Sequence, residues 1–208
     1  MRQQGVLLVV SGFSGAGKGT IMKALLEKYE NYALSVSATT RKPRVGEVDG
    51  REYFFKEKEE FEEMIANNAL IEYACYVGNY YGTPRAYVEE QLAEGKDVIL
   101  EIEIQGARKI RQQFPEAVLL FVSPPSAQEL KERLMGRGTE SQEVIEDRLS
   151  RAAEEAVGID EYDYFVINDV VEDCVEQVHR IVESEHAKVF RNQGQIACIE
   201  KQVRMFRQ

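Results

Sequence analysis

The fold is decided by the stretch Val6-Leu-Leu-Val-Val-Ser-Gly-Phe-Ser-Gly-Ala-Gly-Lys-Gly-Thr20. Its apolar first half predicts a strand of a parallel sheet that is buried on both faces. Its second half, Gly12-x-x-x-x-Gly17-Lys18, leads directly into a helical spacing of apolar residues. Such glycines let backbone N–H groups converge on an anion, and the helix N-terminus and the lysine add positive charge. The stretch therefore predicts a phosphate-binding loop. A mere glycine-rich turn with a surface lysine would not account for the strand–helix frame.

Strands and helices alternate along most of the remaining chain. Expected strands cover 33–36, 97–103, 117–123 and 164–168, and expected helices cover 19–30, 105–113, 126–134 and 141–155, followed by a long last helix with a valine stripe from Val171 to Val189. This order predicts an α/β fold with a parallel sheet wrapped by helices. Residues 34–88 contain short strands and turns instead, which indicates a lobe inserted between two core elements.

The composition narrows the class of protein. A net charge of −10 argues against broad binding to nucleic acids or anionic membranes, so a phosphate ligand needs positive charge concentrated locally. No apolar run is long enough to span a membrane, and no secretory signal is visible. Three widely spaced cysteines without metal-ligand spacing indicate a reduced, cytoplasmic chain. We expect no nucleic-acid or membrane partner, and a homo-oligomer is left open.

Two arginines stand three residues apart in a proline-stiffened loop. The planar guanidinium groups of Arg41 and Arg44 suit bidentate recognition of one phosphate. Tyr53 and Tyr81 offer hydroxyl donors nearby in the same lobe. Exposed arginines and half-buried tyrosines are common, so this pattern by itself is weak evidence.

Glu72 interrupts an apolar strand, Ile71-Glu72-Tyr73. A buried carboxylate needs hydrogen-bond donors, and guanine presents two adjacent ones, N1–H and the N2 amino group. A glutamate on the solvent face of a strand is the competing interpretation. Glu101 and Glu103 are two apart near the end of another strand, so we expect both on one face, where they could orient magnesium-bound water or a nucleotide.

Four arginines flank the glycines at 136 and 138, namely Arg133, Arg137, Arg148 and Arg151. This pattern predicts a mobile cationic lid that stabilises a transferring phosphoryl group, although ion pairing with acids of the same segment is the alternative. A phosphate monoester acceptor is already largely a dianion at neutral pH, so the reaction needs no general base. The lack of an evident catalytic triad fits this chemistry.

Several motifs together resemble the guanylate kinase family, in the right order, over about residues 5–185. They are residues 12–20, Ser37-x-x-Thr-Arg41-x-Pro-Arg44-x-Gly-Glu-x-x-Gly, Gly78-Asn-Tyr-Tyr-Gly-Thr83, Glu-Ile-Glu-Ile-Gln-Gly106 and Arg137-Gly-Thr-Glu. The resemblance implies that ATP and GMP give ADP and GDP, with Mg²⁺, in guanine nucleotide salvage and recycling. It implies a P-loop NTPase core (5–33, 89–134, 163–185), a GMP-binding lobe (34–88) and a lid (135–162), followed by an extension (186–208).

The resemblance also assigns roles to individual residues. It places ATP on Gly12, Phe13, Ser14, Gly15, Ala16, Gly17, Lys18, Gly19 and Thr20, with Asn168 near the adenine. It places the GMP phosphate on Arg41, Arg44, Tyr53 and Tyr81, and guanine on Ser37, Glu72, Thr83 and Glu103. Catalysis is implied for Lys18, Arg41, Arg137 and Arg148, the last two closing over the transferring group.

Three positions depart from the family pattern. Phe13 replaces a common proline, which alters the stiffness of the loop but not its donors. Gly19 occupies the usual Ser/Thr slot of a P-loop, so the hydroxyl facing Mg²⁺ is expected from Thr20. Glu103 replaces a usual aspartate, which puts its reach to the base or to a water in doubt.

Two other functions compete with the kinase hypothesis. A non-catalytic interaction module would bind phosphopeptides on the arginine lobe, but such modules typically lack the competent loop that Lys18 completes. A kinase for another nucleoside monophosphate would share the loop and the lid, but it would not explain Glu72 beside Arg41 and Arg44.

Overall fold

The larger sheet carries the phosphate-binding loop at its centre. The computed structural model describes residues 4–76, 78–136 and 142–207, and among these the sheet has five parallel strands in the order β2-β7-β1-β8-β9. They are β1 (Leu7–Gly12), β2 (Tyr32–Leu34), β7 (Asp97–Glu101), β8 (Val118–Ser123) and β9 (Tyr164–Ile167). On β1, Leu8 pairs with Ile99 on one side and Val118 on the other. The predicted parallel α/β fold is confirmed.

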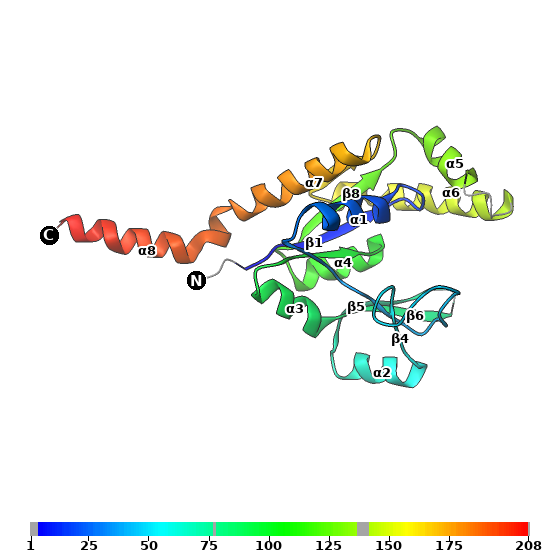
Figure 1. Ribbon diagram of the computed structural model, residues 1–208, viewed down its shortest axis with the longest axis horizontal. Coiled ribbons are helices and arrows are strands. Elements are labelled where there is room, and N and C mark those ends of the chain that lie inside the picture. Colours follow the sequence, from blue (N-terminus) through cyan, green and yellow to red (C-terminus); the bar gives the residue numbers. More distant parts are fainter. Residues whose placement is uncertain (1–3, 77, 137–141, 208) are drawn as a thin grey trace.

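Helices cover both faces of this sheet, which explains the continuous apolar run of β1 (Figure 1). Leu8 and Val10 face α1 (Lys18–Lys28) and α7 (Val171–His186) in one buried cluster. Leu7 and Val9 face the opposite layer, which contains α3 (Arg85–Ala93) and α4 (Ile104–Gln113). Successive strand residues point to opposite faces, so every residue of the run is buried.

A second, smaller sheet lies to one side of the core, beneath α4 in Figure 1. In the described chain it has four strands, ordered β4-β3-β6-β5, and α2 (Lys58–Ala66) packs against it. The strands are β3 (Ala38–Thr39), β4 (Phe54–Phe55), β5 (Leu70–Tyr76) and β6 (Asn79–Pro84). Phe61 of α2 is fully buried and stacks on Tyr80, with ring centroids 5.2 Å apart. This sheet therefore has a small core of its own.

Two helices pack beside the phosphate-binding loop. Leu130 and Leu134 of α5 (Ala127–Met135) are buried with Ala152 of α6 (Gln142–Ala156). Phe13 of the loop packs against this cluster and also meets Phe121 of β8 edge to face, with ring centroids 5.0 Å apart. Phe13 thus links the loop, the core sheet and both helices. A short 3₁₀ helix, η1 (Ile159–Glu161), connects α6 to β9.

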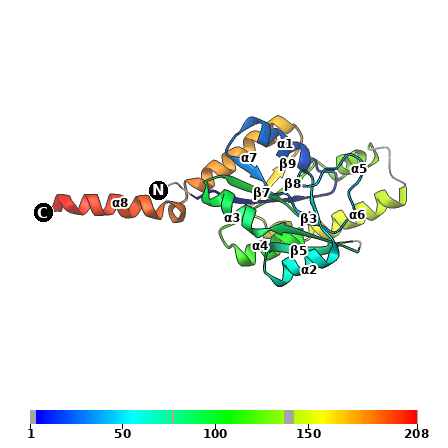
Figure 2. The same ribbon diagram turned by 60° about the horizontal axis from the view of Figure 1, so that its bottom comes forward.

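The chain ends in a helix that projects from the body (Figures 1 and 2). The expected valine stripe is buried at Val175, Val178 and Val182, but the prediction that α7 includes Val189 is wrong. The helix stops at His186, whose Nε2 lies 2.7 Å from Oδ1 of the buried Asp97. There follow η2 (Val189–Asn192), α8 (Gln193–Arg204) and η3 (Met205–Arg207). No helix in the described ranges is long and apolar enough to cross a membrane.

Candidate active site

The loop of residues 12–20, here called the phosphate loop, has a backbone that only glycine fits. Gly12, Gly15 and Gly17 all have φ in the left-handed region, at 154°, 89° and 88°. A Cβ on Gly12 would lie 2.1 Å from the Val122 carbonyl oxygen, and one on Gly17 would lie 2.3 Å from Nδ2 of Asn168. Sterics therefore fix the curl of the loop.

Positive charge and free donors converge at the end of this loop. Gly17 is the N-cap of α1 and makes no side-chain cap, so helix N–H groups stay available to a ligand. Lys18 is half-buried, and its Nζ donates to the carbonyl oxygens of Gly12 (2.8 Å) and Phe13 (3.3 Å). The loop, the helix end and the lysine together form an anion site.

The side chain of Asn168 fixes the backbone of the phosphate loop. Its side chain is buried, and its amide Nδ2 donates to the Ala16 carbonyl oxygen at 2.7 Å. The backbone carbonyl oxygen of Asn168 accepts a hydrogen bond from Nη2 of Arg133 at 3.0 Å. Arg133, expected in the lid, thus braces the loop through Asn168. The expected contact between Asn168 and adenine stays a prediction.

The two glutamates at the end of β7 do not share a strand face, so that prediction is wrong. The strand ends at Glu101, and Glu103 is instead the N-cap of α4 with its side chain exposed. Oε2 of Glu101 lies 4.0 Å from where a Cβ would stand on Gly19. Desolvation raises the pKa of Glu101 above its ordinary value, and nearby Lys18 opposes this. The side chain of Glu101 therefore lies beside the phosphate loop.

The donor set around the loop fits Mg²⁺ better than a tightly chelated metal. Thr20 is exposed in the first turn of α1 and directly follows Gly19, whose Cβ position would lie 4.0 Å from Oε2 of Glu101. The described residues contain no group of three His, Cys, Asp or Glu side chains placed to hold a metal. Mg²⁺ typically takes one or two protein oxygens and completes its shell with water and substrate phosphates. Thr20 and Glu101 meet that requirement.

Arg41 is anchored by an acid that the sequence did not single out. Its Nη1 and Nη2 donate to Oε2 and Oε1 of Glu47 at 3.0 and 2.9 Å. Oε2 of Glu47 also accepts from the backbone N–H of Arg44 at 2.7 Å. The hydrogen bonds from Arg41 lower the pKa of Glu47, with the Arg44 backbone bond adding to this. Glu47 thus orders residues 41–47, here called the arginine loop.

Aromatic rings support the same arginine. The guanidinium carbon of Arg41 lies 5.3 Å from the ring centroid of Tyr53 and 5.8 Å from that of Phe55. The Tyr53 and Tyr81 rings are 6.0 Å apart, edge to face. Burial raises the pKa of Tyr53, so its hydroxyl stays protonated and able to donate. The structure therefore brings Arg41, Tyr53 and Tyr81 together, while the Arg44 side chain is exposed beside them.

Glu72 is a buried carboxylate that Thr83 contacts as a hydrogen-bond donor. The hydroxyl of Thr83, on the neighbouring strand β6, donates to Oε1 of Glu72 at 2.9 Å. Thr83 lies directly before Pro84, the N-cap of α3. Burial raises the pKa of Glu72, whereas the Thr83 bond and Lys109 oppose the rise. Burial rules out the solvent-face interpretation.

The lack of a side chain at Gly106 of α4 leaves space for the carboxylate of Glu72. A Cβ on Gly106 would lie 3.2 Å from Oε2 of Glu72 and 3.1 Å from Cδ1 of Ile102. The helix therefore approaches the carboxylate more closely than a larger residue would allow. Ser37, predicted for the same region, is half-buried directly before β3.

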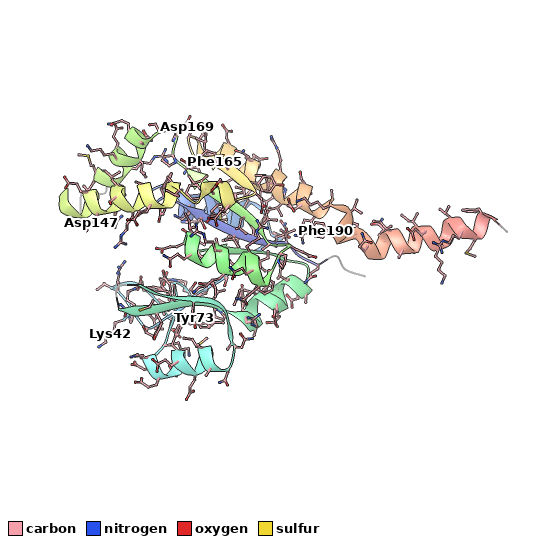
Figure 3. The ribbon with its side chains drawn as sticks, turned by 180° about the vertical axis from the view of Figure 1, so that it is seen from behind. Lys42, Tyr73, Asp147, Phe165, Asp169 and Phe190 are labelled. Atoms are coloured by element: carbon pink, nitrogen blue, oxygen red, sulfur yellow. The ribbon has the colours of Figure 1, made fainter. Side chains whose placement is uncertain are left out.

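Helix α6 reaches the phosphate loop. Nη1 of Arg148 lies 3.3 Å from the hydroxyl oxygen of Ser14. Glu155 at the other end of α6 is half-buried, and desolvation raises its pKa, with Lys18 opposing and Glu103 reinforcing the shift. Arg137 lies outside the described residues. Lys42 of the arginine loop and Asp147 of α6 lie at the same end of the molecule (Figure 3).

Three residues of this site escaped the sequence analysis. Gly106 stands in the quoted motif Glu-Ile-Glu-Ile-Gln-Gly, but no role was assigned to it there. Glu47 follows the arginine pair, where an acid next to bases suggests an ion pair. Glu155 lies among many acids of α6, so nothing in the sequence distinguishes it.

Comparisons with known proteins agree with this geometry. The sequence model of the guanylate kinase family matches residues 4–185. The guanylate kinase of Lactococcus lactis is 54% identical over 191 residues, covering 92% of this chain and 93% of that one. That of Bacillus cereus is 56% identical over 187 residues, covering 89% and 91%. A crystal structure of guanylate kinase from Anaplasma phagocytophilum superposes with a TM-score of 0.74 at 34% identity, covering 92% of this chain and 91% of that one. The chain therefore belongs to the guanylate kinase family, and its activity is the phosphorylation of GMP by ATP to give GDP and ADP.

Proposed function

We propose that three parts of the chain divide this reaction. Residues 5–33, 89–134 and 163–185 form the core that holds ATP, residues 34–88 form the lobe that binds GMP, and residues 135–162 form the lid. The observation that carries the assignment of the acceptor is the buried Glu72, with Thr83 as its protein donor and Gly106 leaving it space.

Guanine is the base that completes Glu72. An ionised carboxylate accepts from both N1–H and N2–H₂ of guanine, whereas adenine lacks this pair of adjacent donors. When guanine removes water from the Glu72 carboxylate, the free-energy cost of desolvation is offset, because the two guanine donors replace the lost hydrogen bonds. Ser37 and Thr83 add hydroxyls, and Glu103, exposed at the start of α4, addresses the base directly or through water.

The GMP phosphate takes the guanidinium groups of Arg41 and Arg44 and the hydroxyls of Tyr53 and Tyr81. Because the phosphate of GMP is already mostly a dianion at neutral pH, no side chain has to remove a proton. The chain contributes position and charge neutralisation, which account for most catalysis of phosphoryl transfer.

The ATP phosphates lie on residues 12–20, where Lys18 neutralises charge beside the helix N-terminus. Arg148 and Arg137 stabilise the transferring group from the lid side. Thr20 and Glu101 would hold Mg²⁺ together with ATP, and the ion would supply charge that offsets the negative phosphate oxygens. Asn168 stabilises the backbone of the phosphate loop through its hydrogen bond to Ala16.

The setting follows from charge and cysteine usage. We assign the protein to the cytoplasm, with three free cysteines in agreement with a reducing compartment. Its partners are GMP and ATP, with no nucleic acid or membrane, and a homo-oligomer is left open.

A panel of nucleoside monophosphates tests the proposal. ADP release with ATP and Mg²⁺ is measured for GMP, AMP, CMP and UMP. We expect turnover with GMP and at least about 10⁴-fold lower kcat/KM for AMP, because adenine would leave Glu72 with an unmet buried charge. Comparable turnover of AMP, or none with GMP, contradicts the proposal.

A further inference from the structure

The C-terminal helix α8 leaves an apolar stripe uncovered. Ile196, Ile199, Val203 and Phe206 follow one another at spacings of three or four, so they share one face of the helical segment. The last three are 50%, 54% and 87% exposed. Among the described residues, none of these four belongs to a buried cluster. The segment extends from the end of the body opposite to α6 and the arginine loop (Figures 1 and 3).

A helix of this kind needs a partner. A 12-residue helix is marginal in water by itself, since most helix stability in proteins comes from packing an apolar face. The stripe is therefore suited to bury itself against another surface.

The net charges of the C-terminal segment and of the rest of the chain indicate which surface the stripe contacts. Residues 186–208 contain five Lys or Arg and one Glu, a net charge of +4. The remaining residues hold 21 basic and 35 acidic side chains, a net charge of −14. Within the C-terminal segment, residues 193–207 hold Glu200, Lys201, Arg204 and Arg207, a net charge of +2, so two such helical segments would repel each other. An anionic membrane or nucleic acid would repel the body. The body of a second copy offers the opposite charge.

We propose that α8 docks on the acidic body of a second copy of this chain. In a twofold dimer each copy gives its helix to the other, so both stripes are buried by one reciprocal exchange.

Sedimentation velocity of the full chain and two matched variants tests the interface. Ile199→Glu places a charge on the stripe. Ala197→Glu adds the same charge about 200° around the helix, on the polar side. We expect a wild-type dimer, an unchanged Ala197→Glu dimer, and at least about tenfold weaker association for Ile199→Glu. Circular dichroism and GMP kinase turnover verify that each variant is folded. A wild-type monomer at all concentrations, or equal effects of the two variants, overturns the proposal.

A neutralised helix distinguishes the docking partners. Lys201→Gln with Arg204→Gln removes two positive charges from α8. Docking on an acidic body predicts a weaker dimer at low salt, whereas pairing of two α8 helices predicts a tighter one and overturns the proposal. Cosedimentation of a monomeric wild-type chain with phosphatidylglycerol vesicles also overturns it, because the apolar stripe would then serve a membrane.

Discussion

The shape of the phosphate loop is set by its backbone, whereas the proposed GMP site of the acceptor lobe is formed by side chains that hold one another in place. In the loop, positive φ angles and close approaches at Gly12 and Gly17 dictate the shape. In the lobe, Arg41 depends on Glu47, and Glu72 depends on Thr83. If the proposed roles hold, the loop would bind any suitable polyphosphate, while the lobe would select its ligand. Substitutions in the two regions should differ in which substrate they affect.

The largest effect is expected from Glu72→Gln. A carboxamide cannot accept from both guanine donors, because one of its two terminal atoms is itself a donor. We expect kcat/KM for GMP to fall by up to about 10⁴-fold, with KM for ATP nearly unchanged. Steady-state kinetics with each substrate varied in turn measures both. Wild-type kinetics with GMP would show that Glu72 does not read the base.

Gly17→Ala tests the phosphate loop, the other region of the comparison. The new Cβ clashes with Nδ2 of Asn168, and φ of 88° is unfavourable for alanine. We expect a loss of at least about 10²-fold in kcat/KM for ATP, because the loop shifts relative to the reacting phosphate. GMP binding, measured by calorimetry without ATP, serves as the internal control and should change little. Equal losses for both substrates would mean that the two regions are not independent.

A smaller effect is expected from Glu47→Gln. Glu47 holds the guanidinium of Arg41 and the backbone of Arg44, so its loss should loosen the arginine loop. We expect KM for GMP to rise by about tenfold, roughly the value of one charge-assisted pair of bonds. A lower KM for GMP would instead mean that Glu47 competes with the phosphate for Arg41.

Gly106→Ala should have the smallest effect of the series. Its Cβ would crowd Oε2 of Glu72 and Cδ1 of Ile102, so the carboxylate has to shift by a few tenths of an ångström. We expect a few-fold rise in KM for GMP and no change in KM for ATP. Gly194→Ala, where nothing lies within 4 Å, is the matched control and should leave both values unchanged.

The comparison also explains what the sequence could predict. The phosphate loop was predictable because its glycine spacing and its strand–helix frame are local, and the core sheet followed from apolar runs. The arginine loop and Glu72 were found by residue type. The approach of Gly106 to Glu72 and the hydrogen bond from Thr83 were not found, because those contacts depend on packing between elements. Glu47 was not singled out although its contacts with Arg41 and Arg44 are local to the loop. The end of β7 was misjudged since the pattern Glu-Ile-Glu-Ile looks like a continuing strand, although α4 begins after Glu103. Val189 fitted the helical period, yet α7 ends at His186, whose Nε2 lies 2.7 Å from Oδ1 of Asp97.

The central claim is that the acceptor lobe gives up stability to keep an ionised carboxylate ready for guanine. The raised pKa of Glu72 means that the folded state binds its proton more tightly than the unfolded state does. The stability that goes with the protonated form is present below the ordinary Glu pKa and is lost as the pH rises through the raised value. At neutral pH the ionised Glu72 therefore opposes folding, and a neutral glutamine does not.

Thermal unfolding of the wild type and of Glu72→Gln at neutral pH, with and without GMP, tests this claim most directly. We expect the free variant to have a Tm equal to that of the wild type or up to about 4 °C higher. We also expect GMP to raise the Tm of the wild type but not that of the variant. A free variant that unfolds several degrees below the wild type, or one that GMP stabilises as strongly, would contradict the account.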